Sequence, residues 1–82
     1  MKLSNKKYKV GQLVKLNCYG SLIYWTVDVD GMCDDFSGET EISPSQIGLV
    51  VKRLERLNSI EHYLVLFGTI RIKMGSDFME AV

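Results

Sequence analysis

Apolar and polar residues alternate along much of this chain, and the alternation predicts β-strands. In the segment IYWTVDVD, residues 23–30, the odd-numbered side chains are apolar and the even-numbered ones are mostly polar. A period of two puts the two sets on opposite faces of a strand. The segment TIRIKM, residues 69–74, repeats the pattern. We therefore expect two half-buried strands, and the odd-numbered face of the first should place Trp25 in the core.

Three further segments are rich in apolar and β-branched residues, which favour strands. They are GQLVKLN at residues 11–17, IGLVVKRLERL at residues 47–57 and HYLVLFG at residues 62–68. The last is apolar on both faces, which is typical of a strand in the middle of a sheet. Residues 47–57 also carry apolar side chains at helical spacing, so a helix is the alternative there, but the β-branched start favours a strand.

Turn-forming residues separate these segments. Asp30-Gly31 is a strong hairpin signal, because both residues tolerate a left-handed backbone. Asn58-Ser59 predicts a second hairpin turn and Gly68 a third. After Gly75, the sequence SDFMEAV predicts one 3₁₀ turn and a short last strand. Together, strands and turns predict an all-β fold, and 82 residues are enough for a single small domain.

The stretch DVDGMCDDFSGE, residues 28–39, is dense in carboxylates, so its spacing can be compared with that of a calcium-binding loop. An EF-hand places glycine at position 6, oxygen ligands at positions 1, 3 and 5, and a bidentate glutamate at position 12. With Gly31 at position 6, Asp28 and Asp30 fit, but position 12 becomes Ser37. The flanks are also strands rather than helices. We therefore interpret the stretch as a turn followed by an exposed loop, without a metal ion.

Charge is balanced in total and uneven along the chain. The 10 basic and 10 acidic residues leave no net charge, whereas a dedicated nucleic-acid-binding domain usually has a basic excess. The first seventeen residues contain five lysines and no acid, and residues 28–41 contain six acids and no base. An acidic segment of this kind can select a basic partner surface and accelerate association with it.

The sequence carries no sign of export or of membrane insertion. The N-terminal MKLSNKKYKV lacks the apolar segment of a signal peptide, and the longest apolar runs fall far short of the roughly 20 residues that span a bilayer. Cys18 and Cys33 form no CxxC pair. We expect a cytoplasmic protein with reduced thiols, with a disulfide as the alternative.

Catalytic and metal-binding patterns are not recognisable in the sequence. His62 is the only histidine and follows Glu61, with no nucleophile placed to complete a triad. The two cysteines and His62 do not supply four zinc ligands at a sensible spacing, and neither GQLVK nor GTIRIK has the spacing of a phosphate-binding loop. We expect neither an enzyme nor a bound cofactor.

Four short stretches occur in an order that is typical of a known family: VGQLV at residues 10–14, GLVV at residues 48–51, YLVLF at residues 63–67 and SDF at residues 76–78. They resemble the small SH3-like β-barrel proteins of tailed bacteriophages, especially marine ones. The resemblance implies a barrel of about five strands with no catalytic residues, and an adaptor, assembly or accessory role.

The chain departs from that family in two places. Gln12 stands where the family has aspartate, and the connection between the first two barrel strands, residues 18–46, is long enough to contain its own hairpin. Residues 1–8 are expected to be a flexible basic segment. For the barrel, the expected core residues are Val14, Leu16, Leu49, Val51, Val65, Phe67, Ile70 and Ile72.

Two functional hypotheses follow. The first is a non-enzymatic protein-interaction or assembly module, a phage structural or accessory protein of the host cytoplasm or virion. Its partner would be another phage protein or a second copy of the chain. Because loops usually carry function, the candidate partner-binding residues lie in the long connection: Tyr19, Tyr24, Asp28, Asp30, Asp34, Asp35 and Phe36.

The second hypothesis is a nucleic-acid-binding barrel of the KOW or Tudor kind. It requires several basic side chains on one face, and binding would then fall steeply with salt. A small phage regulator that binds a host protein remains a third possibility. The candidate nucleic-acid-binding residues are Lys6, Lys7, Lys9, Lys15, Lys52, Arg53, Arg56, Arg71 and Lys73.

Overall fold

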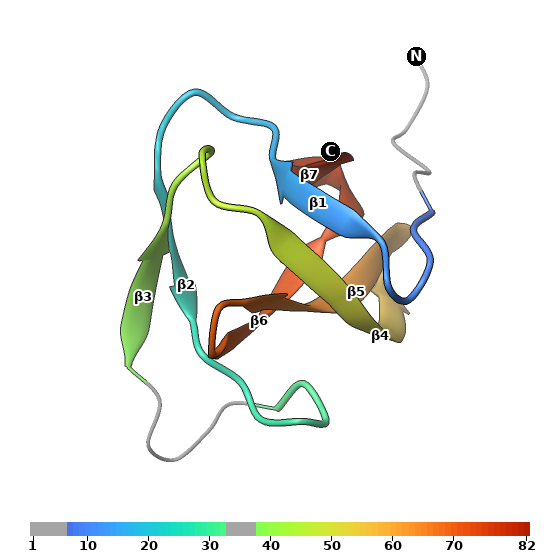
Figure 1. Cartoon of the computed structure of the whole chain (residues 1–82). Coiled ribbons are helices and arrows are strands. Elements are labelled where there is room, and N and C mark those ends of the chain that lie inside the picture. Colours follow the sequence, from blue (N-terminus) through green and yellow to red (C-terminus); the bar gives the residue numbers. More distant parts are fainter. Residues whose placement is uncertain (1–6, 33–37) are drawn as a thin grey trace.

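A computed structural model describes residues 7–32 and 38–82 and confirms an all-β fold (Figure 1). Over these residues no helix is long and apolar enough to cross a bilayer. The elements of the described chain follow one another as β1 (Leu13–Leu16), β2 (Leu22–Trp25), β3 (Glu39–Ile42), β4 (Gly48–Leu57), β5 (Ile60–Phe67), β6 (Ile70–Gly75), the 3₁₀ turn η1 (Ser76–Phe78) and β7 (Met79–Ala81).

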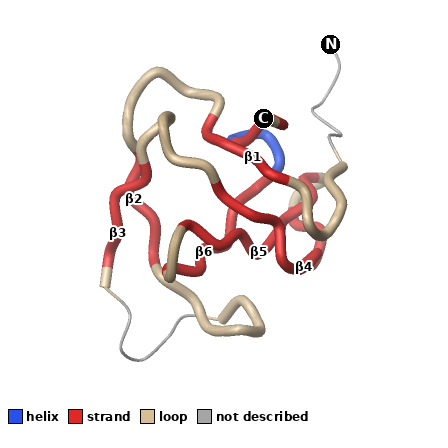
Figure 2. Tube along the Cα trace, viewed as in Figure 1, coloured by secondary structure: helices blue, strands red, loops and turns tan. Residues whose placement is uncertain are grey.

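The strands form two antiparallel sheets (Figure 2). The larger sheet has the order β6-β5-β4-β1-β7, so that β5 lies between two neighbours, as its apolar faces predict. β2 and β3 form a separate two-stranded ribbon. An isolated bridge between Thr26 and Ile72, and a hydrogen bond from the Val27 N–H to the Arg71 carbonyl, connect the end of β2 to β6. The long connection between β1 and β4 therefore contains a hairpin, as expected.

The hairpin turns predicted at Asn58-Ser59 and at Gly68 are confirmed, but the hairpin turn predicted at Asp30-Gly31 is wrong. Asn58 and Ser59 have φ angles of 51° and 65° and close the β4–β5 hairpin, which excludes the helical alternative for this segment. Gly68, with φ of 65°, begins the turn between β5 and β6. At Asp30-Gly31 the chain also turns, and the Gly31 N–H donates to the Asp28 carbonyl over 3.1 Å. That turn lies within the β2–β3 connection and does not join the two strands directly.

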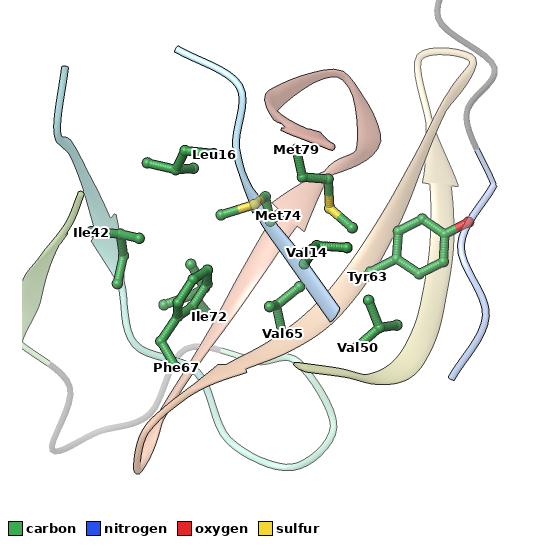
Figure 3. Close-up of a cluster of buried hydrophobic side chains, with 10 residues drawn as sticks. All are labelled: Val14, Leu16, Ile42, Val50, Tyr63, Val65, Phe67, Ile72, Met74 and Met79. Atoms are coloured by element: carbon green, nitrogen blue, oxygen red, sulfur yellow. The ribbon is translucent and has the colours of Figure 1, made fainter. Parts of the chain in front are cut away.

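Ten side chains form the buried core (Figure 3). Nine of them come from strands of the larger sheet, and Ile42 of β3 adds one from the ribbon. Five of the eight predicted core residues belong to it, and Ile70 packs against it half-buried. Leu49 and Val51 do not belong to it, so this part of the prediction is wrong. The core members are Val14, Leu16, Ile42, Val50, Tyr63, Val65, Phe67, Ile72, Met74 and Met79.

The error in β4 has a steric cause. Both faces of β4 are apolar near its start, so the sequence pattern alone does not decide which one is buried. The strand turns Gly48 and Val50 inward, and a Cβ at Gly48 would lie only 2.6 Å from Cγ1 of Val65. The absence of a side chain lets β4 approach β5 closely, and Leu49 and Val51 then fall on the outer face.

The predicted burial of Trp25 is also wrong, because its side chain is 58% exposed. In β2 the even-numbered residues Leu22 and Tyr24 turn towards the core, while Ile23 and Trp25 face outward. Only at Val27, which is 6% exposed, does the odd-numbered face become buried. A two-stranded ribbon packs on one side only, and its outer face is left to the solvent.

Candidate functional site

A groove of about 630 Å³ runs between β2 and the edge formed by β6 and η1. It lies where the ribbon meets the larger sheet, with lining residues from both β2 and β6. Its walls come from three separate parts of the chain: the ribbon with the turn that follows it, strands β4 to β6, and η1. The lining residues are Ile23, Tyr24, Trp25, Val27, Gly31, Met32, Glu55, His62, Lys73, Gly75 and Phe78.

The rim of the groove is apolar and exposed. Ile23 is 65% exposed, Trp25 58%, Met32 66% and Phe78 47%. These four side chains come from β2, the following turn and η1, so the fold gathers them around one groove. Large apolar groups that remain together in water are typical of interaction surfaces, and tryptophan is among the residues that contribute most to binding energy at such surfaces.

Tyr24 lies in the wall of the groove and reaches towards the core. Burial, followed by the nearby Cys18 and Asp77, raises the pKa of its phenol to about 12. Tyr19, the other tyrosine predicted to bind a partner, is fully exposed and does not line the groove. The structure therefore brings only Tyr24 into the groove.

The polar groups of the groove already interact with other protein groups. Lys73 Nζ lies 2.7 Å from Glu55 Oε1, and this hydrogen bond, with the charge of Lys73, lowers the pKa of the Glu55 carboxyl. Nδ1 of His62 is 3.0 Å from the Ile60 carbonyl oxygen. A partner that enters the groove would therefore contact the apolar rim first. The charged groups deeper in the groove, Lys73 and Glu55, already compensate each other's charge.

The acidic residues of the predicted site organise the turn instead of lining the groove. Oδ1 of Asp28 accepts the N–H groups of Met32 and Asp30, at 3.0 and 2.9 Å, and these two bonds lower the pKa of its carboxyl. Oδ1 of Asp30 is 3.7 Å from Nζ of Lys52. Asp34, Asp35 and Phe36 lie outside the described residues.

Four of the nine candidate nucleic-acid-binding residues are engaged in ion pairs. Lys15 pairs with Glu80, Lys52 with Asp30, Arg53 with Glu61 and Lys73 with Glu55. Lys7, Lys9 and Arg56 are exposed, Arg71 is half-buried on β6, and Lys6 lies outside the described residues. Paired cations contribute less to a positive surface potential than free ones, which weakens this hypothesis.

The part of the chain that the structure describes offers little for metal or thiol chemistry. Within residues 7–32 and 38–82 no three His, Cys, Asp or Glu side chains are grouped as metal ligands would be. Cys18 is a free thiol whose Sγ–H donates to the Gly20 carbonyl over 3.0 Å.

Sequence reasoning missed the residues that define the rim. Ile23 and Trp25 were assigned to the buried face, and Phe78 and Met32 were not considered for binding. A weak signal for the true orientation exists: Ile23 and Trp25 lie opposite Glu41 and Glu39 on β3. Directly opposite residues share a face, and a face with two glutamates is more often exposed.

Comparisons with known proteins identify no relative. The sequence matches no protein family, and no curated protein or solved structure is significantly similar to it.

Proposed function

We propose that this chain is a non-enzymatic protein-interaction or assembly module built on an SH3-like barrel. Three features support the barrel. β4, β5 and β6 form a meander, β1 pairs with both β4 and β7, and a 3₁₀ turn directly precedes the last strand. The long connection that holds the ribbon lies between the first and second strands of that barrel. Its insertion there creates one wall of the groove.

The observation that carries the proposed function is the exposed apolar rim of the groove. Trp25, Ile23, Met32 and Phe78 remain open to water although a well-packed core lies directly beneath them. Large exposed apolar side chains lower the solubility of a protein. A chain without net charge has little electrostatic repulsion between molecules to prevent association. A protein partner that covers these apolar side chains would explain why they are exposed in the isolated chain.

A protein segment suits the groove better than a small polar metabolite. The groove is open and has an apolar rim, and its charged groups Lys73 and Glu55 are already paired. Extended peptides bind such grooves by placing apolar side chains into them, with tryptophan as an anchor. The partner would therefore present apolar or aromatic side chains from a loop or an extended segment.

The phage assignment rests on the resemblance of the four short stretches to small SH3-like phage proteins. Under this assignment the chain is a structural or accessory protein, and its partner is another phage protein or a second copy. Nucleic acid is the less favoured partner, because four of the candidate cations are paired with acids.

The test is affinity capture from the native source with the full chain as bait, with and without nuclease. The proposal expects a protein that is retained after nuclease treatment and is lost when Trp25 is replaced by serine. Loss of all captured protein on nuclease treatment would favour the nucleic-acid alternative. Capture that is unaffected by Trp25→Ser would remove the groove from the binding site.

A further inference from the structure

The outer face of the larger sheet carries a leucine stripe between cations. On β5, Leu64 and Leu66 point away from the core, since Tyr63, Val65 and Phe67 point into it. Leu66 lies opposite Arg71 of β6, and Leu64 lies between Lys52 of β4 and Lys73 of β6. Directly opposite residues share a face of the sheet. Three cations therefore flank two leucines on the side of the sheet that faces away from the core.

The turn after β2 crosses this face and leaves a hollow beside it. A Cβ at Gly31 would lie 2.8 Å from Cδ1 of Leu54, so the turn packs closely against β4 at that point. Beyond the contact the hollow has a volume of about 300 Å³, at the lower end of the volumes of small-molecule sites. Its lining residues are Val29, Val51, Lys52, Leu64, Leu66 and Arg71.

Among the described residues, Arg71 is the cation of this hollow that lacks a counter-ion. In residues 7–32 and 38–82 it forms no ion pair, whereas Lys52 and Lys73 each have one. Its Nε is buried and has no hydrogen-bond acceptor there. Asp28 is close enough to respond to its charge, but the Asp28 carboxylate already accepts the N–H groups of Met32 and Asp30. A buried guanidinium N–H without an acceptor is costly.

We propose that this hollow binds a carboxylate attached to an apolar group, with the carboxylate accepting hydrogen bonds from Arg71 and the apolar group resting on Leu64, Leu66, Val29 and Val51. Arginine favours planar oxyanions because its donors form a fixed fork. The site is separate from the proposed protein-binding groove, since no residue lines both.

The apolar wall decides which class of anion fits. A nucleic-acid phosphate would leave the exposed parts of Leu66, Val29 and Val51 without a contact, and would meet in Arg71 the one lining cation without an ion pair among the described residues. A carboxylate with an aliphatic chain satisfies both halves of the hollow. The same chemistry occurs in a free fatty acid and at the C-terminus of a protein chain that ends in an apolar residue, and the test below separates these two sources.

The test is an NMR titration of the full chain with octanoate, followed at the backbone amides of Leu64, Leu66 and Val29. Octanol supplies the chain without the charge, and acetate supplies the charge without the chain. The proposal expects binding of octanoate that is at least roughly tenfold tighter than that of either control compound, the factor that about 1.4 kcal/mol of added interaction provides. Equal shifts with octanol, or equal shifts with acetate, would overturn it.

Variants locate the site. Arg71→Gln removes the charge and should weaken octanoate binding by roughly tenfold, the effect of losing a charge-assisted hydrogen bond. The matched control Lys15→Gln removes one cation from β1, outside the hollow, and should leave binding unchanged. If Arg71→Gln impairs folding, Val29→Asp tests the same point, because Val29 is 61% exposed and the new carboxylate would repel the ligand. Binding that survives both substitutions contradicts the proposal.

An N-acetylated dipeptide with a C-terminal leucine distinguishes the two sources. Tighter binding of its free acid than of octanoate assigns the hollow to the C-terminus of a partner chain. Tighter binding of octanoate assigns it to a free amphiphile. If neither compound shifts the amides of the hollow, the proposal is wrong, whatever is found for the groove.

Discussion

Arg53 of β4 and Glu61 of β5 interact diagonally across the hairpin, where the guanidinium donates two hydrogen bonds to the carboxylate. Nε of Arg53 lies 3.2 Å from Oε2 of Glu61, and Nη2 lies 3.0 Å from Oε1. Glu61 is only 5% exposed, whereas more than half of the Arg53 side chain is open to water. The partly exposed Arg53 thus supplies the counter-charge of a buried carboxylate.

Replacing Glu61 with glutamine should lower the free energy of unfolding by about 1–2 kcal/mol, because a charge-assisted pair of hydrogen bonds is lost in a buried position. The matched control is Glu55→Gln, which weakens the exposed pair with Lys73 and should cost less stability than Glu61→Gln, because solvent screens an exposed ion pair. Urea denaturation monitored by tryptophan fluorescence measures both. Equal losses would mean that burial of Glu61 does not strengthen the pair.

Gly48→Ala should destabilise the protein by about 1–3 kcal/mol, the usual cost of adding a methyl group to a filled core. The new Cβ would lie 2.6 Å from Cγ1 of Val65 and 2.7 Å from Cζ of Phe67. At Gly20 the same substitution meets no atom within 4 Å, which makes Gly20→Ala the control. The melting temperatures of the two variants test the close approach of β4 and β5, and similar values would disprove it.

Ser59→Gly should stabilise the β4–β5 hairpin by about 1 kcal/mol. Ser59 has φ of 65°, a left-handed conformation that costs roughly 1–2 kcal/mol for a residue with a Cβ and little for glycine. Part of that gain is offset by the larger entropy of glycine in the unfolded chain. Asn58→Gly should gain less, since asparagine tolerates the left-handed region. Chemical denaturation compares them, and a loss of stability in Ser59→Gly would contradict the assigned turn.

The burial of Tyr24 predicts a fall in stability at high pH. An unfolded tyrosine ionises near its ordinary pKa of 10.0, but in the fold the pKa of Tyr24 is about 12. Between these values the unfolded state binds fewer protons than the folded state, so the free energy of unfolding decreases as pH rises from 10 towards 12. Below pH 10 this contribution is fully present.

Ultraviolet absorbance of the phenolate, recorded during an alkaline titration, measures the effect directly. The wild-type protein should show phenolate absorbance that develops only close to the pH of alkaline unfolding, and Tyr24→Phe should show less of it. Tyr8→Phe is the informative comparison, because burial also raises the pKa of Tyr8 and its hydroxyl donates to the Met79 carbonyl. Four tyrosines that titrate together near the ordinary pKa would show that Tyr24 is not enclosed.

The sequence predicts the strands of the larger sheet well, but it misses β3, whose residues were expected in an exposed loop, and it predicts the buried faces less well. Hairpin turns at Asn58-Ser59 and Gly68 are encoded locally, by residues that tolerate positive φ, and both are found. The buried face of β4 was mispredicted because residues 48–51 are apolar on both sides. In that case burial depends on Gly48, whose missing side chain leaves room for Val65 and Phe67 of the neighbouring strand β5.

The candidate site was less predictable than the fold for a related reason. Alternation in residues 23–30 correctly indicates a strand at its beginning, but both faces of Leu22–Trp25 are apolar and either one satisfies the pattern. The choice depends on the partner strand β3 and on the bridge from Thr26 to Ile72, which are non-local. The groove itself joins β2 to η1, across more than half of the chain, and no local pattern encodes that contact.

The central claim is that the exposed rim of the groove binds a protein partner. Ile23 and Val10 offer a matched pair of variants, because they are 65% and 66% exposed and only Ile23 lies on the rim. The most direct measurement is the affinity of the nuclease-resistant captured partner for wild type, Ile23→Ser and Val10→Ser by calorimetry. The account predicts a loss of roughly fivefold or more, the effect of about 1 kcal/mol at an interface, for Ile23→Ser alone. Equal affinities for all three proteins would contradict it.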